Sequence, residues 1–352
     1  MNQESLPEYD IPTLSETLSI LKRVDLHFGN DNGPRHFAIA GGTPSLAIFG
    51  RPWAANWTPP QTNEHVSMEF DPGCKIEYVI GDVRDKERLH RVAHGVDFIV
   101  HSAATKIVPT AEYNPFECIK TNVNGAMNVI DVAIEQKVKK IVALSTDKAC
   151  NPVNLYGATK LASDKLFVAA NLHTLTSNTC FSIVRYGNVM GSRGSVIPFF
   201  QNRAKTGVLP ITDDRMTRFM ITLEQGVDLV WHAFEDMVGG EIYVKKTPSM
   251  KVTDVALACV PDATFDIVGI RPGEKLHEQM IGSEDAPYTY EYSEHYKVLP
   301  AIHGWSSDPA RIDGGVLVGQ EFKYCSDNNS DWMSIASLQT WIEQNRHHLG
   351  KF

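Results

Sequence analysis

The side chains best suited to chemistry lie in one segment, from Ser145 to Lys160. Tyr156 and Lys160 are four residues apart, so on a helix they share one face, where an ammonium can favour the phenolate of a Tyr whose ordinary pKa is about 10. A tyrosinate in this position can take a proton from a hydroxyl group while hydride leaves the same carbon. The alternative is an exposed Tyr and Lys on a helix, but Thr146, ten residues upstream of Tyr156, favours a catalytic group.

Asp147 and Lys148 follow directly after the apolar run KIVALS (140–145) and Thr146. If that run is a strand of a parallel sheet, these residues lie at its carboxyl end, which is the catalytic rim of such sheets. An adjacent carboxyl and amine form a plausible coupled pair for proton transfer, with pKa values tuned to the task. The alternative reading is a capping Asp beside a solvated Lys.

The elements that must position these residues are strands and helices in alternation. Four short apolar runs have the composition of buried parallel strands. They are KIEYVIG (75–81), DFIVHSA (97–103), KIVALS (140–145) and FSIVRYG (181–187). Helices are predicted between them, over 114–136, which opens with Asn-Pro, and over about 156–170. Such repeats predict an α/β fold with a doubly wound parallel sheet, and ligands at the carboxyl ends of its strands.

Beyond Gly187 the elements become shorter and richer in turn residues, as in SRGSVIP, ITDDRMTR and IRPGEK. This change predicts a second, smaller region laid over the sheet. We therefore divide the chain into an atypical segment, 1–36, a sheet domain, 37–190, in which 48–66 is divergent, and a substrate-binding region, 191–352. Residues 222–246 are expected to return to the sheet.

The composition excludes several classes of protein. The chain has 352 residues, of which 43% are hydrophobic and 21% charged, which is typical of a folded globular protein. Its net charge of −9 predicts no binding to nucleic acid or to an anionic membrane. It contains neither a long apolar run nor a signal peptide, so we expect a cytoplasmic location. Neither His277-Glu278 nor His347-His348 has metal-ligand spacing, and no metal is expected.

Longer motifs carry a resemblance to a known family. They are STDKACNPVNLYGATKLASDKLFVAAN (145–171), VRYGNVMGSRGSVIPFF (184–200), MTRFMITLEQGV (216–227), GGEIYVKKTPSMKVTDVA (239–256) and IRPGEKLHEQMI (270–281), extended by GDVRDKERL (81–89), AEYNPFECIKTNVNGAMNVI (111–130) and FKYCSDNNSDWM (322–333). From about residue 67 to 340 the chain resembles extended short-chain dehydrogenase/reductases, and among them the inverting UDP-N-acetylglucosamine 4,6-dehydratases of polysaccharide biosynthesis. A similar retaining branch lacks the Tyr of YxxxK, so Tyr156 favours the inverting type.

The resemblance implies a Rossmann-like fold and a mechanism. Tyr156, helped by Lys160 and Thr146, would oxidise C4 of the sugar by hydride transfer to bound NADP, and the new ketone would acidify H5. Lys148 would abstract H5, and Asp147 would protonate the departing C6 hydroxyl. Hydride would then return to C6, and a proton to C5 from the opposite face.

The resemblance also implies binding residues, a homo-oligomer and a surface-glycan route. NADP, with NAD not excluded, would be held by Gly41, Gly42, Thr43, Asp82, Val83, Ala103, Ala104, Tyr156 and Lys160. UDP-N-acetylglucosamine would be held by Lys106, Arg185, Asn188, Arg218, Arg271 and Glu274. A guanidinium offers bidentate bonds to phosphate, which supports the arginines; surface salt bridging is the alternative.

The first 66 residues depart from this family. Where the family has a GxxGxxG turn the chain has AGGTPSLA (40–47), and Pro44 replaces the glycine that lets the backbone approach the pyrophosphate. Between Gly41 and Gly81 no second strand can be located. Either the segment is a genuine replacement that weakens cofactor binding, or the gene carries a frameshift or a sequencing error.

Three functional alternatives therefore stay open beside an active dehydratase. The first is a catalytically impaired paralogue that binds a UDP-sugar without turnover. The second is the product of a mis-assembled gene, with the same consequence. The third is a sugar-nucleotide epimerase or reductase on the same fold, which would leave C6 oxygenated.

Overall fold

The computed structural model describes residues 79–174, 177–192, 195–302 and 304–345, and the backbone of strands β1 (Ser45–Phe49) and β2 (His65–Glu69). The chain divides into two compact units, one of Met1–Ile80, Gly191–Asn202 and Gln339–Phe352, the other of Gly81–Met190 and Arg203–Leu338. The larger unit contains Thr146, Asp147, Lys148, Tyr156 and Lys160. It also contains most of the residues assigned to the predicted substrate-binding region.

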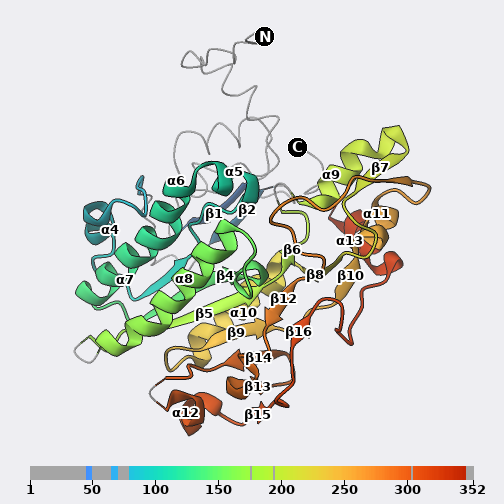
Figure 1. Cartoon of the computed structure of the whole chain (residues 1–352). Helices are drawn as coiled ribbons and strands as arrows, with labels where there is room; N and C mark the ends of the chain where they lie inside the picture. Colours follow the sequence, from blue (N-terminus) through green and yellow to red (C-terminus); the bar gives the residue numbers. More distant parts are fainter. Residues whose placement is uncertain are drawn as a thin grey trace, which may run out of the picture. The chain divides into compact units, whose positions relative to one another are not determined.

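The larger unit is built on a seven-stranded sheet with the order β15-β13-β14-β9-β5-β4-β3 (Figure 1). Its parallel half contains β3 (Phe98–His101), β4 (Lys140–Thr146), β5 (Cys180–Tyr186) and β9 (Ile242–Lys245). Its antiparallel half contains β14 (His295–Val298), β13 (Thr289–Glu291) and β15 (Val316–Leu317). The strands predicted within 97–103, 140–145 and 181–187 are confirmed. Residues 222–246 supply β9, which pairs in parallel with β5.

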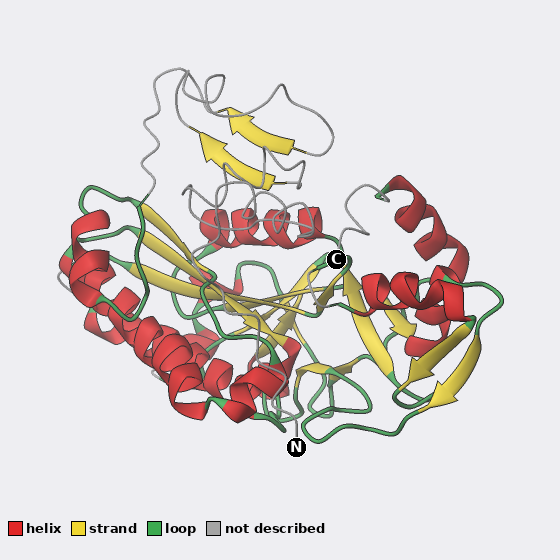
Figure 2. Ribbon diagram, turned by 90° about the horizontal axis from the view of Figure 1, so that it is seen from above, coloured by secondary structure: helices red, strands yellow, loops and turns green. Residues whose placement is uncertain are grey.

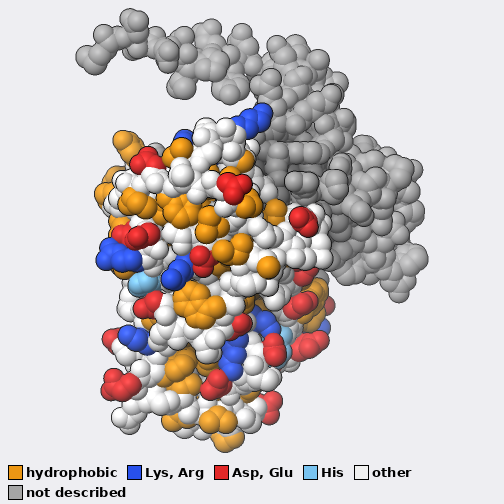
Figure 3. Space-filling view, turned by 90° about the vertical axis from the view of Figure 1, so that its right-hand side faces the viewer, with side chains coloured by type: hydrophobic (Ala, Val, Ile, Leu, Met, Phe, Trp, Pro, Cys, Tyr) orange, Lys and Arg blue, Asp and Glu red, His pale blue; other side chains and the backbone are white. Residues whose placement is uncertain are grey.

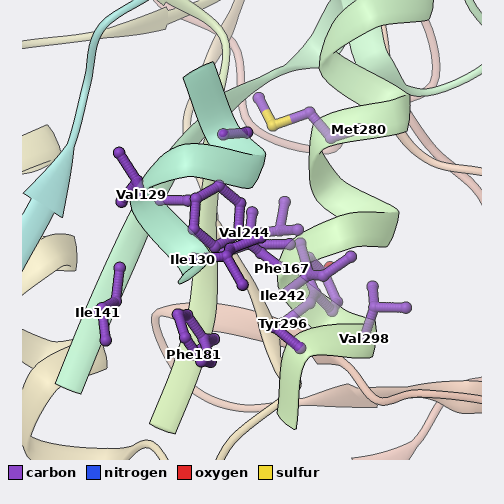
Figure 4. Close-up of a cluster of buried hydrophobic side chains, with 14 of the residues drawn as sticks. Val129, Ile130, Ile141, Phe167, Phe181, Ile242, Val244, Met280, Tyr296 and Val298 are labelled. Carbon is purple, nitrogen blue, oxygen red and sulfur yellow. The ribbon is translucent and has the colours of Figure 1, made fainter. Parts of the chain in front are cut away.

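Helices cover both faces of the parallel half (Figure 2). Successive strand residues point to opposite faces, so one strand can serve two cores. Ile141 and Ile183 pack against α7 (Gly125–Glu135) and α8 (Leu155–Ala170), in the cluster drawn in Figure 4. Val142 and Val184, their neighbours in sequence, pack against α10 (Leu223–Asp236). This arrangement is the doubly wound sheet that the sequence predicts.

The helix predicted over 114–136 is formed as a continuous succession of three elements. α6 (Pro115–Ile119) starts with proline, whose missing N–H is no loss at that position. A π-helical turn, η1 (Lys120–Asn124), joins α6 to α7 and carries the buried Asn122. Such turns often accompany functional sites. The helix predicted over 156–170 is α8, which begins one residue earlier.

Smaller elements complete the chain. Three further sheets pair β10 (Ser249–Lys251) with β8 (Thr217–Ile221) and β6 (Asn188–Val189), β11 (Thr264–Ile267) with β7 (Val208–Ile211), and β12 (Gln279–Ile281) with β16 (Tyr324–Cys325). Among the described residues the remaining α-helices are α4 (Lys86–Val92), α5 (Val108–Tyr113), α9 (Val196–Arg203), α11 (Val252–Cys259), α12 (Pro309–Ile312) and α13 (Ile335–Gln344).

The secondary structure predicted for the first 81 residues agrees less well with the structure. The described part of the strand predicted over 75–81, Val79–Gly81, has no regular structure. β1 and β2 form a parallel pair in a stretch where we located no strand. Aligning residues 40–47 with a glycine turn concealed the apolar run Ser45–Phe49, which has the composition of a buried strand. The strand predicted at 37–43 lies outside the described residues.

The surface carries no single dominant charge on the described part of the face shown in Figure 3, where acidic and basic side chains are interspersed. Within the part of the chain that the structure describes, no helix is both long and apolar enough to cross a membrane.

Candidate active site

The predicted catalytic residues begin at the carboxyl end of β4. Thr146 is the last residue of that strand, and the 3-10 turn η2 (Asp147–Ala149) follows it directly. The Thr146 hydroxyl donates to Asp147 Oδ1 at 2.9 Å and accepts from the Lys148 backbone N–H at 3.3 Å. These two bonds fix the turn, so three neighbouring residues present their side chains in a defined arrangement.

The Lys148 ammonium lies between two buried carboxylates. Its Nζ is 3.0 Å from Asp147 Oδ1 and 3.5 Å from Glu278 Oε1. Asp147 is 0% exposed and Glu278 3% exposed. Burial opposes the charge on Lys148, but the two carboxylates outweigh it and raise the pKa of Lys148. The Lys148 ammonium is thus held by carboxylates on both η2 and the segment before β12.

Tyr156 is brought to this cluster by the close approach of α8 to η2. Asn154 caps the helix, because its Oδ1 accepts from the Gly157 N–H at 2.8 Å. A Cβ on Gly157 would lie 2.2 Å from the Lys148 carbonyl oxygen, so only glycine permits this contact. Burial raises the pKa of Tyr156 to about 12, opposed by Lys148 and by a hydrogen bond with Thr146. Lys148 therefore favours the phenolate in the structure, which is the effect that the sequence predicts for Lys160.

Lys160 is 4% exposed, one turn further along α8. Burial lowers its pKa, and the negative charge of Asp164 opposes this. Within the described part of the chain its ammonium forms no hydrogen bond. Burial and the charge of Lys160 lower the pKa of His101, on β3, to about 3, so this imidazole is neutral.

The loop after β3 forms the other side of the site. Asn122, on the π-helical turn, accepts from the Thr105 N–H at 2.7 Å and donates to the Thr105 carbonyl at 3.1 Å and the Thr159 hydroxyl at 2.9 Å. These bonds tie the loop that contains Ala103 and Ala104 to α8. Burial, and then repulsion by Lys148, lower the pKa of Lys106, which therefore lies near the catalytic cluster.

A segment that we call the strap, residues 271–281, is bonded along its length to the loop between β4 and α8. Its partners there are backbone and amide groups as well as Lys148. The bonds run from Asn154 Nδ2 to the Gly273 carbonyl (2.7 Å), from Lys275 Nζ to the Cys150 carbonyl (2.5 Å) and from Asn151 Nδ2 to Gln279 Oε1 (2.7 Å). Two motifs more than 100 residues apart in sequence thus form one site.

Arg185 and Arg218, which the family resemblance assigns to the substrate, are bonded within the protein. Arg185 is buried, pairs with Asp164 at 3.1 Å and donates to the Met280 carbonyl at 2.8 Å. Arg218 donates to the backbone carbonyls of Thr217, Lys275 and Leu276, at 2.7, 3.1 and 3.1 Å. Both guanidinium groups donate to backbone carbonyls of the strap, whereas Arg185 Nε has no hydrogen-bond partner among the described residues.

Arg271, in contrast, is open to solvent. Its side chain is 70% exposed and forms an ion pair of 2.6 Å with Glu274 in the same turn. Gly273 makes the turn possible with a φ of +83°. The predicted pair Arg271 and Glu274 is thus accessible at the outer end of the strap.

The other predicted binding residues are more dispersed. Asn188 lies on β6, and its Oδ1 is buried without a hydrogen-bond partner among the described residues. Asp82 is bonded by Arg84 at 2.6 Å, and Val83 packs on the core. Gly41, Gly42 and Thr43 lie outside the described residues. No cluster of three potential metal ligands occurs in the described part of the chain.

The sequence analysis missed three residues that build this site: Asn122, Asn154 and Glu278. Asn-Leu before Tyr156 is a recognisable N-cap signal, so Asn154 could have been found. The roles of Asn122 and Glu278 depend on partners 17 and more than 100 residues away, which no local pattern reveals.

Comparison with known proteins identifies the family. Residues 54–300, more than half of the chain, match the family described as polysaccharide biosynthesis protein. The chain is 57% identical over 276 residues to "UDP-N-acetylglucosamine 4,6-dehydratase (inverting)" of Campylobacter jejuni, which covers 76% of this chain and 82% of that protein. The chain belongs to this family. The resemblance seen in the motifs is confirmed.

Solved structures show the same fold. Pen from Bacillus thuringiensis is 29% identical, with a TM-score of 0.70 over 88% of this chain and 92% of that one. DesIV, a dTDP-glucose 4,6-dehydratase from Streptomyces venezuelae solved with NAD and TYD bound, is 22% identical, with a TM-score of 0.52 over 66% and 77%. These likenesses confirm the Rossmann-like fold class.

A second family matches the start of the chain. Residues 12–87 match the glycosyltransferase family 9 (heptosyltransferase), and this stretch overlaps the other match only from residue 54. The divergent residues of the sequence analysis fall inside it. The departure from the dehydratase family therefore coincides with a likeness to an unrelated one.

Proposed function

We propose that this chain dehydrates UDP-N-acetylglucosamine at C4 and C6 with inversion at C5, giving a UDP-2-acetamido-2,6-dideoxy-4-hexulose for surface polysaccharide or nonulosonic acid biosynthesis. The observation that carries the proposal is the buried cluster of Thr146, Asp147 and Lys148 against Tyr156. It joins a hydroxyl-activating phenol to a separate acid and base, and elimination of water needs all three. The 57% identity to a dehydratase of this name supports it.

A nicotinamide cofactor fits the described part of the site. The Lys160 side chain is 4% exposed, its pKa is lowered by burial, and a ribose hydroxyl could accept a hydrogen bond from its ammonium. Ala103 and Ala104 would leave room beside it, and Tyr156 lies on the same helix face. The cofactor supplies a reversible hydride acceptor. NADP is our proposal, with NAD as the alternative.

Proton movements during oxidation fall to Tyr156. With a pKa raised to about 12, its phenol is protonated at neutral pH, so Lys148 and Thr146 have to assist its ionisation. The phenolate then accepts the proton of the C4 hydroxyl. The ketone that results makes H5 acidic enough for an amine to remove.

Elimination falls to Lys148 and Asp147. Transfer of one proton from the Lys148 ammonium to Asp147, across 3.0 Å, produces an amine and a carboxylic acid together. The amine abstracts H5, and the acid protonates the C6 hydroxyl as it leaves as water. Because both groups are held on one short turn, base and acid act on adjacent carbons.

The nucleotide would be held at the outer end of the strap. Arg271 is exposed and offers a fork of N–H groups suited to the diphosphate, and Glu274 orients it. Lys106 lies near Lys148, which is closer to the sugar than a phosphate clamp would be. We further propose a cytoplasmic homo-oligomer.

The experiment is incubation of the purified chain with UDP-N-acetylglucosamine and NADP in deuterated water, followed by mass spectrometry and NMR of the product. The expected product has lost one water and carries deuterium at C5. Product of unchanged mass would favour the epimerase alternative. If no product forms although the cofactor is shown to be bound, the proposal that this chain is a dehydratase is wrong.

The N-terminal match supports the alternative of an impaired or mis-assembled gene product. Gly41, Gly42 and Thr43 stay our candidates for the pyrophosphate turn, but the glycosyltransferase likeness over residues 12–87 weighs against them. Cofactor content of the purified chain, read from its absorbance, separates these cases. A chain without bound or bindable NADP would support the alternative.

A further inference from the structure

Glu278 is a buried carboxylate to which the mechanism above gives no part. It precedes β12, and its backbone is fixed by Ser326, whose Oγ accepts from the Glu278 N–H at 2.9 Å and whose N–H donates to the Glu278 carbonyl at 2.8 Å. Its Oε1 lies 3.5 Å from Lys148 Nζ and 3.8 Å from Arg218 Nε. Its Oε2 has no hydrogen-bond partner among the described residues.

Burial of the Glu278 carboxylate destabilises the fold unless a cation lies beside it. A buried polar atom without a hydrogen bond costs about 1–3 kcal/mol, and more when it is charged. Arg218 gives its terminal N–H groups to backbone carbonyls, so its contribution to Glu278 is the distant Nε. The nearest cation is the Lys148 ammonium.

We propose that Glu278 is a positioning residue for the dehydration: it aims the Lys148 amine and stabilises the ammonium that forms when H5 is removed. The inference rests on the proposed function and extends it. Glu278 itself takes up no proton and touches no reacting atom, so it acts through Lys148.

The step balances without a further reactant. The C5–H bond breaks and its proton goes to Lys148 Nζ, while the electron pair forms the C5–C6 double bond. The C6–O bond breaks, and the proton of Asp147 goes to the leaving oxygen to give water. The new ammonium then lies between the carboxylates of Asp147 and Glu278, which is the arrangement in the structure.

Other charged and titratable groups also face Lys148 and set the background for the test. Asp147 approaches from η2, Arg218 from β8, Lys106 from the loop after β3 and Tyr156 from α8. Arg218 and Lys106 disfavour the ammonium, and Asp147 favours it. Removal of Glu278 would leave one carboxylate against two cations.

The test is the pKa of Lys148, measured by NMR on protein labelled with 15N-lysine, with the signal assigned by its loss in Lys148→Arg. In Glu278→Gln we expect this pKa to fall by about one unit or more, because one opposite charge within hydrogen-bonding range is lost. Glu278→Asp keeps the charge and should keep most of the shift. Ser326→Ala is the matched control, because it removes the hydrogen bond to the Glu278 N–H and leaves the carboxylate.

An unchanged Lys148 pKa in Glu278→Gln, or an equal fall in Ser326→Ala, would overturn the proposal. If Glu278→Gln does not fold, Glu278→Asp provides the test. The shorter side chain places the carboxylate further from the ammonium, so the pKa of Lys148 should fall by a smaller amount than in Glu278→Gln. This measurement needs no turnover. If the chain is inactive but the Lys148 pKa falls as expected in Glu278→Gln, the proposed function is refuted and the role of Glu278 towards Lys148 is not.

In an active chain the same variant has a kinetic signature. The reactive form carries one proton on the Lys148–Asp147 pair, so the rate of deuterium incorporation at C5 should fall once the pH exceeds the Lys148 pKa, and Glu278→Gln should move this fall to lower pH. The rate of C4 oxidation, in which Lys148 only assists Tyr156, should change less than the rate of deuterium incorporation. A uniform loss in both steps at every pH would indicate a structural role and contradict the inference.

Discussion

The two segments that meet at the candidate active site differ in how they expose their charges. In the segment from Ser145 to Lys160 the carboxylate and both lysines of the chemistry are buried or half-buried. Along the strap the exposure of the charged side chains differs: Arg271 at one end is exposed, and Glu278 near the other end is buried. Groups that exchange protons need burial to tune their pKa values, whereas a group that captures a dissolved diphosphate must be open to water.

Tyr156→Phe should have the largest effect, on the buried side of this comparison. Without a phenol to take the C4 proton, oxidation should slow by about 10²–10⁴-fold, the usual contribution of a general base. Rapid-mixing absorbance of the reduced cofactor measures this step. Tyr113→Phe is the control, because Tyr113 is 88% exposed; equal losses in the two variants would refute the role of Tyr156.

The pH dependence of this step has a defined sign. Burial raises the pKa of Tyr156 to about 12, so the phenolate is the minor form at neutral pH and grows as pH rises. The oxidation rate of the wild type should therefore increase with pH over the neutral and mildly alkaline range. A rate that falls over this range would contradict a phenolate base.

Much of this fold could be predicted from local patterns. The runs around Ile141 and Ile183 are continuous and apolar because both faces of their strands are covered. The helix predicted over about 156–170 is α8. The predicted position of Thr146 to Lys148 at the end of a strand then indicated that they lie at the ligand site, because ligands bind at that edge of a doubly wound sheet.

The remainder depends on partners distant in sequence. Nothing near Arg185 in the sequence indicates that it is buried against Asp164 and the Met280 carbonyl, so these contacts could not be predicted. Glu278 was considered only as part of a metal motif. For Gly41, Gly42 and Thr43 the pyrophosphate turn stays a prediction, and a match to a second family over residues 12–87 weighs against it.

Arg185→Met tests the structural role of this arginine. Removing it leaves Asp164 buried and uncompensated, which should lower the free energy of unfolding by about 3–5 kcal/mol. Adding Asp164→Asn should recover part of the loss, because the orphaned charge is gone. Chemical denaturation measures both. A raised KM with unchanged stability would instead restore Arg185 as a substrate ligand.

Gly157→Ala tests the approach of α8 to the catalytic turn. Its Cβ would meet the Lys148 carbonyl at 2.2 Å, so we expect a loss of about 1–3 kcal/mol and a lower kcat from displaced Lys148. Gly226→Ala in α10 is the control, since its nearest neighbour is Tyr186 Cε1 at 4.0 Å. There alanine should be neutral or stabilising by up to about 1 kcal/mol. Equal behaviour of the two variants would mean that the contact does not constrain the site.

Arg271→Ala should have the smallest effect on the protein and a selective effect on substrate. Its ion pair with Glu274 is exposed, and such pairs contribute about 0–1 kcal/mol to stability. Loss of charge-assisted bonds to the diphosphate should raise KM about tenfold or more at nearly unchanged kcat. Arg215→Ala is the matched control, because Arg215 is 68% exposed and pairs with Asp213 at 2.7 Å. If Arg271→Ala lowers kcat and leaves KM unchanged, Arg271 acts in the chemical step and not in binding. The exposed end of the strap would then not differ in role from the buried segment Ser145 to Lys160.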